Sequence, residues 1–435
     1  MIASCLLAVA LAQPQSLEAP ALPSPLTLPQ AEAIFLAHGL DLLVAEANAR
    51  GAEGDLRAAG AHPNPGLDFG VAYGPPVTGD ILSGNLGGNA PNTTWGLSFG
   101  LTDNAAIEDV LSGKHALRVA VAAKALAAAK QSLVDLRRNE LAQLRQAFVG
   151  ALLARDNLAF ALQVQQSYEQ SYELNRTRFQ KGDINEADLA KISVAKLESD
   201  QAVTQARGGL EVAKAALGFL LGVRGTLPAF DVAGDLDDQP APGLQGKGVG
   251  DLVAIGLANR PDVKAAAATR EQQEALLTQA RRLVIPDIGL QLGYSEQCNG
   301  GTCSSVPTFS AGLSGNLPVL YQQQGEIRRA ESNLDAARAT EEKVRAQVLT
   351  DVAQAWAGYQ AARELVDRME KAELAQAKLS RDLEELMYRK GAASLLDYLD
   401  AERTYIATNL EYQQDLASYW NALYQLEQAT AIALR

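Results

Sequence analysis

Four short segments of the chain alternate between large apolar residues and small or polar ones. The first is GLDFGVAY at 66–73, in which every second residue from Leu67 to Tyr73 is large and apolar. The other three are TWGLSFGLT at 94–102, IGLQLGYS at 288–295 and TFSAGLSGNL at 308–317. This period-two pattern predicts two β-hairpins, 66–101 and 287–317, with the alternation that is typical of transmembrane barrel strands. In isolation, the same pattern also fits half-buried strands of a soluble sheet.

Helical periodicity fills most of the remaining sequence. Long helical stretches are predicted at 113–180 and 322–389, each able to span about 100 Å. In the first, Leu141, Leu144 and Phe148 recur three and four residues apart, which indicates a packing face along the helix. Shorter helices are predicted at 30–60 and 250–283, and medium ones at 185–221 and 394–432. Because such long helices cannot fold back over a small sheet, this context favours strands that face lipid.

The chain is an internal duplication. Residues 30–73 align without a gap with 251–294, so that Pro65 matches Pro286 and Tyr73 matches Tyr294. We expect a first repeat at 13–223, a Pro/Gly/Asp-rich connector at 224–248 and a second repeat at 249–435. The first copy is longer, with extra residues in the loop 74–92 and near 102–113. The predicted fold is mainly α, with two long helical hairpins and four β-strands per chain.

Each repeat contains the same short turn between its long and medium helices. Gly182 and Gly391 suit the left-handed position just past a helix end. Asn185 and Ser394 are good N-caps for the next helices. Acidic residues follow three positions later, at Asp188 and Asp397, as in a capping box. The turns 182–185 and 391–394 are therefore predicted to close the two helical hairpins at the end farthest from the membrane.

Strand number sets the expected assembly. The smallest transmembrane barrels need about eight strands, so four strands cannot close one. Open sheet edges are not tolerated in lipid. Several copies must then pool their strands, and three copies would form a barrel of about twelve.

Composition and charge narrow the function classes. The chain is 47% hydrophobic but only 6% aromatic, which suits closely packed helices. A formal net charge of −13 argues against a nucleic-acid partner. No stretch approaches the roughly 18 uninterrupted apolar residues of a spanning helix. Residues 1–12 are predicted to be a cleaved signal peptide, with a lipid anchor at Cys5 as the alternative, and either predicts export.

Candidate chemistry is sparse. Cys298 and Cys303 are separated by four residues rich in Gly and Asn, which predicts a disulfide-closed loop, with a metal pair as the alternative. The three histidines, His38, His62 and His115, have no metal-ligand spacing. No phosphate loop, nucleophile elbow or zinc motif occurs. We therefore predict no enzyme activity, no cofactor and no bound metal.

Two segments resemble a known family. AHPNPGLDFG at 61–70 and MYRKGAASLLDYLDAERTY at 387–405, in this duplicated order of elements, look like the outer-membrane efflux proteins of the TolC family. AHPNP at 61–65 and SGKHALRVAVAA at 112–123 look more like its CzcC-like heavy-metal-efflux branch. The resemblance implies a homotrimer with a 12-stranded barrel in outer-membrane lipid and a trimeric α-barrel through the periplasm. It also implies two partners, a periplasmic adaptor protein and an inner-membrane pump of the RND type.

The resemblance also assigns roles at the tip. The family's inward aspartates match Asp397 and Asp400, which would form carboxylate rings at a pore constriction. Capping alone explains Asp397 equally well, whereas Asp400 lies beyond capping reach. A family latch between tyrosine and aspartate maps onto Tyr388 and Asp188. A second latch uses an arginine where this chain has Ala393, a departure that predicts a less tightly held entrance.

Three functions fit these features. The leading one is the passive exit duct of a tripartite efflux system in the bacterial outer membrane. The same duct serving type I protein secretion is the second, and an exported helical scaffold without a pore is the third. The sequence leaves the transported substrate open among drugs, metal ions and proteins, and it leaves open whether the resting tip is open or closed.

Overall fold

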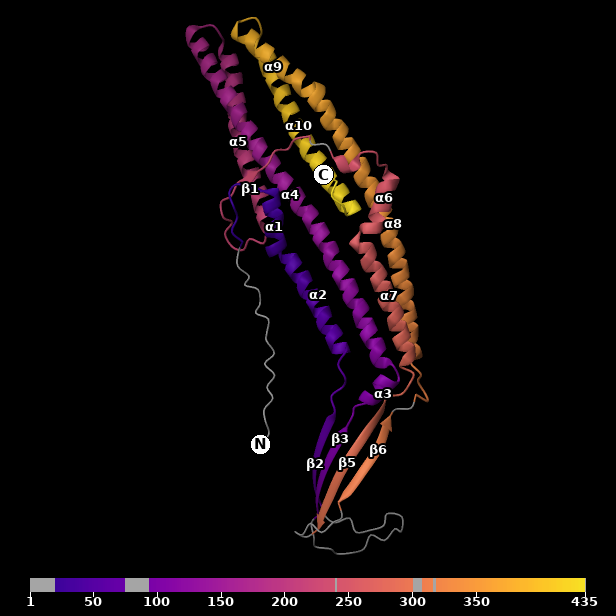
Figure 1. The fold of residues 1–435 in the computed structure, drawn as a ribbon. Helices are drawn as coiled ribbons and strands as arrows, with labels where there is room; N and C mark the ends of the chain where they lie inside the picture. Colours follow the sequence, from indigo (N-terminus) through magenta and orange to yellow (C-terminus); the bar gives the residue numbers. More distant parts are fainter. Residues whose placement is uncertain (1–19, 75–93, 239–240, 300–306, 316–317, 435) are drawn as a thin grey trace. The chain divides into compact units, whose positions relative to one another are not determined.

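The computed structural model describes residues 20–74, 94–238, 241–299, 307–315 and 318–434 (Figure 1). The chain divides into two compact units, each described by itself. Unit 1 comprises the described residues of Met1–Ala47, Ser132–Asp262 and Arg345–Arg435. Unit 2 comprises those of Asn48–Gln131 and Val263–Val344. The predicted cleaved segment 1–12 and Cys5 lie outside the described residues.

Unit 2 contains a four-stranded antiparallel sheet in the order β2-β3-β5-β6. Its strands are β2 (Gly66–Gly74), β3 (Thr94–Thr102), β5 (Ile288–Asn299) and β6 (Thr308–Gly315). The two predicted hairpins therefore join edge to edge through β3 and β5. Strand β5 extends beyond the predicted hairpin arm into the expected loop, because residues 295–299 continue to pair with β3 as far as Asn299 opposite Thr94.

The register aligns the large residues in rows across the sheet. Phe69, Phe99, Tyr294 and Phe309 lie opposite one another on the four successive strands. The ring centroids of Phe69 and Phe99 are 5.1 Å apart, and those of Tyr294 and Phe309 are 5.3 Å apart. Side chains alternate between faces along a strand, so small and polar residues share the opposite face. The alternation seen in the sequence thus becomes one aromatic and aliphatic face and one face of Gly, Ser, Thr and Asp.

Helices make up most of the rest. They are α1 (Leu28–His38), α2 (Leu40–Ala59), α3 (Ala106–Leu111), α4 (Lys114–Lys181), α5 (Glu186–Leu220), α6 (Val249–Asn259), α7 (Pro261–Arg282), α8 (Gln324–Arg368), α9 (Leu374–Arg389) and α10 (Leu395–Thr430). A 3₁₀ turn, η1 (Pro242–Leu244), and a π-helical turn, η2 (Met369–Glu373), complete the set. Helix α3 accounts for part of the extra length near 102–113 in the first repeat.

Three predicted helices are interrupted. The helix expected at 30–60 breaks at Gly39 (ψ 121°), where an added Cβ would lie 2.7 Å from the carbonyl oxygen of Phe35. The helix expected at 250–283 breaks at Arg260 (ψ 128°), because the residue before a proline is pushed out of the helical region. The stretch 322–389 contains the turn η2, which inserts one extra residue per turn and so rotates the faces of the following helix.

The connector 224–248 is bound to the helices of unit 1. Strand β4 (Val232–Ala233) pairs in parallel with β1 (Leu26–Thr27). The indole nitrogen of Trp420 on α10 donates to the carbonyl of Asp237 at 3.1 Å. Arg155 on α4 donates to the carbonyls of Val232 (3.1 Å) and Gly234 (2.7 Å). The composition of 224–248 predicts a connector, but none of these contacts follows from the composition.

Among the described residues, one helix is long and apolar enough by length and composition to cross a membrane. It is α4, and 33% of its most apolar window is buried inside the chain. The helix was predicted at 113–180, but not as a candidate span, because charged residues interrupt its apolar stretches. One such helix is weak evidence for a span, since core helices of soluble proteins have the same composition.

Candidate functional site

The two turns of unit 1 have matching backbone geometry. Gly182 follows α4 with φ +80°, and Gly391 follows α9 with φ +76°. Behind each glycine, the next backbone N–H donates to a carbonyl near the helix end: Asp183 to Arg178 at 2.9 Å and Ala392 to Met387 at 2.8 Å. Both turns thus end their helices in the left-handed conformation that glycine adopts without strain.

The caps of the two following helices differ. Ser394 and Asp397 form a full capping box: Ser394 accepts from the Asp397 backbone N–H at 3.2 Å, and Asp397 accepts from the Ser394 backbone N–H at 3.1 Å. Asn185 accepts from the Asp188 backbone N–H at 2.8 Å. The Asp188 carboxylate instead pairs with Lys191 at 3.0 Å. The reciprocal box predicted at the first turn is therefore only half formed.

Both hairpins contribute to one apolar core near the turns. Its buried residues are Phe160, Val164, Tyr168, Ile192 and Ala195 of the first hairpin and Tyr388, Leu395, Tyr398 and Leu399 of the second. The rings of Tyr388 and Tyr398 stack with their centroids 5.5 Å apart and their planes 6° apart. The Arg178 guanidinium lies over the Tyr388 ring at 5.0 Å and donates to the carbonyl of Arg389 at 2.9 Å. Each hairpin tip is thus buried partly by residues of the other.

The hydroxyl of Tyr388 donates to the side-chain oxygen of Asn175, which is 0% exposed. The Asn175 amide in turn donates to the carbonyl of Ser171 at 2.7 Å, and the Ser171 hydroxyl lies 3.0 Å from that of Tyr398. Tyr388 and Asp188 do line the same small cavity at the tip, with a volume of about 290 Å³. Within the single chain, however, the hydrogen bond of each predicted latch residue goes to another partner.

The two predicted constriction carboxylates, Asp397 and Asp400, are both exposed. Residues three apart share a face of a helix, so they lie together on the side of α10 opposite the buried Tyr398 and Leu399. Hydrogen bonds from the Ser394 side chain and backbone hold the pKa of Asp397 below its usual range. The Asp397 carboxylate is thus held in the helix cap, whereas the Asp400 carboxylate makes no capping hydrogen bond with the described residues.

A buried carboxylate lies one turn further along α10. Glu402 is 1% exposed and accepts from the Ser167 hydroxyl at 3.4 Å, and Arg381 on α9 approaches it to 3.8 Å. Burial raises the pKa of Glu402, while the nearby positive charge of Arg381 opposes that shift. Sequence reasoning missed Glu402 and also missed Asn175 and Arg178. The only available signal was a polar residue at a position where the helical period expects an apolar one.

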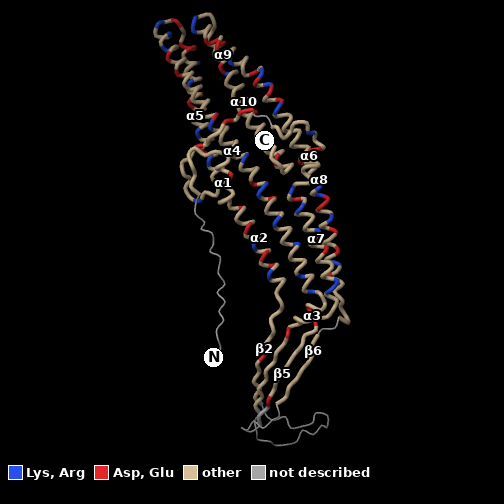
Figure 2. Tube along the Cα trace, in the orientation of Figure 1, with Lys and Arg blue, Asp and Glu red and all other residues tan. Residues whose placement is uncertain are grey.

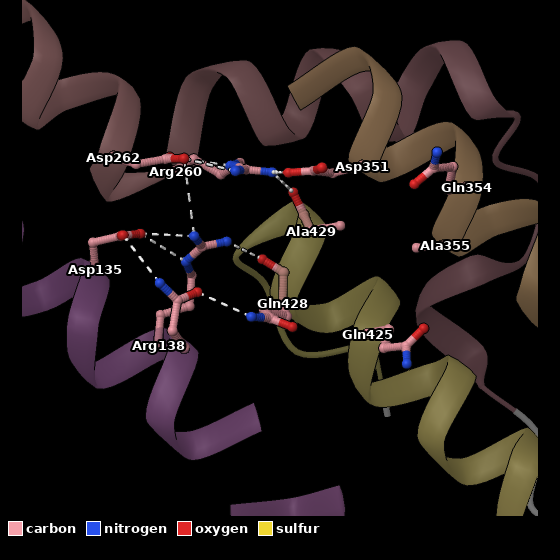
Figure 3. Close-up of a pocket in the computed structure, with 11 residues that line it drawn as sticks. Asp135, Arg138, Arg260, Asp262, Asp351, Gln354, Ala355, Gln425, Gln428 and Ala429 are labelled. Atoms are coloured by element: carbon pink, nitrogen blue, oxygen red, sulfur yellow. Dashed lines mark hydrogen bonds and ion pairs between the residues drawn. The ribbon is translucent and has the colours of Figure 1, made fainter. Parts of the chain in front are cut away.

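A second polar cluster in unit 1 surrounds a cavity of about 410 Å³ (Figure 3). Arg260 donates to Asp262 at 2.6 Å and to Asp351 at 2.8 Å, and Arg138 pairs with Asp135 at 2.7 Å. The guanidinium of Arg138 also donates to the backbone carbonyl of Gln428. These charges are paired with one another between α4, the break between α6 and α7, α7 itself and α8, and backbone carbonyls of α10 accept from both arginines. The cluster therefore holds the helices together and leaves no charge assigned to a ligand.

The sheet of unit 2 exposes its apolar face. Leu67 is 76% exposed, Phe309 79% and Leu313 77%, and most other large residues of this face are exposed by 40% or more, whereas Leu290 and Tyr294 are half-buried. Charged residues lie along the helices and almost disappear from the four strands (Figure 2). Glu296, opposite Leu97, is the one charged side chain of this face among the described strand residues, and a surface otherwise so apolar requires a cover other than water.

The remaining predicted chemistry has little structural counterpart. Among the described residues, no group of three or more His, Cys, Asp or Glu side chains is placed to hold a metal ion. His62 and His115 stack with their ring centroids 4.6 Å apart, a contact that their distance in the sequence does not predict. Cys303 lies outside the described residues, so the predicted disulfide between Cys298 and Cys303 stays a prediction.

The duplicated helical hairpins, the strands with an exposed apolar face and the two matching turns together define a class of protein. The model of the outer membrane efflux protein family matches residues 34–223 and 252–431. The chain belongs to this family. It is an outer-membrane protein that extends into the periplasm.

Its relatives include metal-resistance proteins. The chain is 23% identical over 316 residues to the cobalt-zinc-cadmium resistance protein CzcC of Cupriavidus metallidurans, covering 72% of each chain. It is 27% identical over 273 residues to the cation efflux system protein CusC of Escherichia coli K12, covering 60% of this chain and 57% of that one.

Solved structures show the same fold. A crystal structure of CusC superimposes with a TM-score of 0.75 at 20% identity, covering 95% of this chain and 98% of that chain. The CmeC outer-membrane channel of Campylobacter jejuni gives a TM-score of 0.75 at 19% identity, covering 93% of this chain and 85% of the other. At these identities the likeness establishes the fold.

Proposed function

We propose that the protein is the passive outer-membrane duct of a tripartite efflux system and that it works as a homotrimer. The observation that carries this proposal is the sheet of unit 2, with its exposed apolar face and its two edge strands. Among the described residues, β2 and β6 are each paired on one side only. In lipid such edges must be paired, and pairing β6 of one copy with β2 of the next satisfies both.

Three copies then give a barrel of about twelve strands, with the aromatic and aliphatic face toward lipid and the Gly/Ser face toward the lumen. The small inner residues leave a wide passage, whereas an inward aromatic face would fill it. The helical hairpins of the three copies would continue this passage into the periplasm. Their tips would meet a periplasmic adaptor protein and, through it, an inner-membrane pump of the RND type that supplies the energy.

The proposed cargo is a metal cation. CzcC and CusC are named for cation resistance and efflux. In this chain, the exposed carboxylates Asp397 and Asp400 lie on one helix face, and threefold repetition would arrange them in two acidic rings. Such rings attract cations and repel anions. Asp400 is the better candidate for a residue that lines the pore, because the Asp397 carboxylate is already bound in the helix cap.

The first test of the duct compares two neighbouring residues of β3 that face opposite sides of the sheet. Phe99→Asp places a charge in the aromatic row of the proposed lipid face, at a cost below the about 2–4 kcal/mol of a lysine or arginine at the bilayer midplane. Ser98→Asp places the same charge on the proposed lumen face. We expect Phe99→Asp to abolish recovery of the protein from the outer membrane and Ser98→Asp to leave it largely intact. Equal recovery of both variants would favour a helical scaffold without a pore.

The mass and selectivity of the extracted particle complete the test. Light scattering in mild detergent, corrected for bound detergent, should give three chains, and a water-soluble monomer would refute the duct. In planar bilayers, Asp400→Asn should reduce the preference for cations over anions. Unchanged selectivity would remove Asp400 from the pore while leaving the barrel proposal standing.

A further inference from the structure

Unit 2 carries a second apolar surface where its strands meet its helices. Five residues form it, and we call them the junction patch: Ile107, Val110, Leu111, Val319 and Leu320. Leu111 is 82% exposed and Leu320 is 98% exposed. Residues 107–111 follow the end of β3, and residues 319–320 follow the end of β6. In this antiparallel order, β3 and β6 both finish at the same end of the sheet, so the patch borders that end at two strands.

Helix α3 is inverted relative to a helix on the surface of a soluble protein. Its acidic residues point inward: Asp109 is 7% exposed and pairs with Arg118 at 2.8 Å, and Glu108 approaches the buried Lys114 to 3.5 Å. Its apolar residues point outward. Charge inside and apolar residues outside is the arrangement expected where the surroundings are less polar than the protein interior.

The helix is also fixed firmly to the sheet. The Asp103 carboxylate, just before α3, accepts from the backbone N–H of Leu290 on β5 at 2.7 Å and from that of Ala105 at 3.2 Å. At the other end, Lys114 donates to the carbonyl of Ile285 and to Asp287, each at 2.6 Å. The outward direction of Leu111 is therefore set by the fold and is not a chance orientation of a loose segment.

Exposed arginines accompany the patch. Arg282 is in the last turn of α7, and Arg328 and Arg329 are near the start of α8, at the same ends of the helices as the patch. Arg328 is also within 3.8 Å of Glu331. Apolar side chains beside exposed cations match the two layers of a phospholipid surface, acyl chains below and phosphates above.

We propose that the junction patch lies in the headgroup region of the periplasm-facing phospholipid leaflet and sets how deeply each chain sits in the outer membrane. The proposal rests on the proposed barrel, because the patch continues the lipid-facing surface beyond one end of the sheet. Helix α3 arises from the extra residues of the first repeat. Among the described residues, the second repeat has no helix equivalent to α3, so it contributes to the contact with the leaflet only through residues 319–320.

Depth-dependent fluorescence quenching tests this proposal in the full chain. The three native cysteines are replaced by serine, and single cysteines are introduced by Leu111→Cys and Leu320→Cys. Each variant carries a polarity-sensitive dye and is inserted into vesicles of phosphatidylethanolamine and phosphatidylglycerol. Quenching is measured with lipids brominated near the headgroup, with lipids brominated deep in the chain, and with aqueous iodide.

Two positions of similar exposure serve as references. Phe69→Cys reports on the middle rows of the sheet, where the native side chain is 61% exposed, and Val212→Cys on helix α5, where it is 71% exposed. We expect positions 111 and 320 to lose fluorescence with the shallow brominated lipid, position 69 with the deep one, and position 212 with neither.

The outcomes separate the two proposals. If position 69 is quenched by lipid while 111 and 320 are quenched only by iodide, the patch is in water and the inference fails although the barrel stands. If 111 and 320 are protected from all three quenchers, another copy of the chain covers them, which also overturns it. If position 69 itself escapes both lipids, the barrel proposal fails, and positions 111 and 320 still decide the patch by their own response to the shallow lipid.

Discussion

Replacing Tyr388 with Phe should loosen the tip mainly by leaving a buried amide without its partner. The ring stays in place, because its contacts with Tyr398 and Arg178 do not involve the hydroxyl. What is lost is the hydrogen bond to the side-chain oxygen of Asn175. Asn175 is 0% exposed, so water cannot replace the lost donor. A buried polar atom left unsatisfied costs about 1–3 kcal/mol, and full burial places this case toward the upper end.

A double-mutant cycle separates this account from the latch that the family resemblance implies. If Tyr388 is bonded to Asn175, the effects of Tyr388→Phe and Asn175→Ala should be coupled by about 0.5–3 kcal/mol. The effects of Tyr388→Phe and Asp188→Ala should then add to within about 0.5 kcal/mol. Asp188→Ala thus serves as the matched control, because it lines the same cavity without sharing the hydrogen bond.

The assay should read the tip itself, since a chain with two units need not unfold in one step. Amide hydrogen exchange of peptides from 160–195 and 385–400 in the detergent-extracted protein reports local opening there. Bilayer conductance of the same variants shows whether a looser tip is also a wider one. Strong coupling to Asp188 with none to Asn175 would refute the reasoning and place the Tyr388 hydroxyl on the predicted latch partner.

Three further changes test the interior of the chain. Arg260→Met should destabilise unit 1 by an amount at the lower end of about 3–5 kcal/mol, because it removes the nearest cation from Asp262 and Asp351, while Asp262 keeps Arg138 at 4.0 Å. The pair of Arg281 is exposed, so Arg281→Met should cost at most about 1 kcal/mol, and similar urea midpoints for both variants would contradict this difference. Burial raises the pKa of Glu402 in the folded chain, so the folded chain binds this proton more tightly than the unfolded chain does. The wild-type protein should therefore lose stability as pH rises from about 4 through that raised pKa. Glu402→Gln cannot titrate and should remove this loss. Parallel pH–stability curves for wild type and Glu402→Gln would show that Glu402 does not titrate in this way. Ser394→Ala should cost about 1 kcal/mol by removing the cap of α10, seen as faster hydrogen exchange in its first turn, and unchanged exchange would rule out that role.

The sequence predicted those features that repeat or that follow a fixed period. The alternation at 66–73 and 288–295 placed the strands, and Gly182 and Gly391 placed the turns, because each is a local pattern with a single physical cause. The break before Pro261 was also readable in principle, since proline restricts the residue that precedes it. Helix α3 was missed because six residues are too few to show a helical period.

Contacts between distant residues could not be read in this way. Asn175 and Tyr388 lie 213 residues apart, and nothing local to either one names the other. The same holds for Ser167 and Glu402. A polar residue inside a long helix indicates only that some partner is needed. Which partner it meets depends on how the two hairpins pack, and that is settled by the shape of the whole core.

The shared core at the tip has a consequence for how the two halves of the chain relate. The duplicated turns place Phe179 and Tyr388 at equivalent positions, yet Phe179 is 39% exposed while Tyr388 is 6% exposed and bonded to Asn175. The position equivalent to Asn175 in the second hairpin is Glu384, and the same bond is not made in reverse because Phe179 has no hydroxyl to donate. The two repeats have thus diverged so that the first supplies the hydrogen-bond acceptor and the second supplies the donor. A half-length chain paired with itself would lack one of them, so the two repeats must now be inherited and folded together.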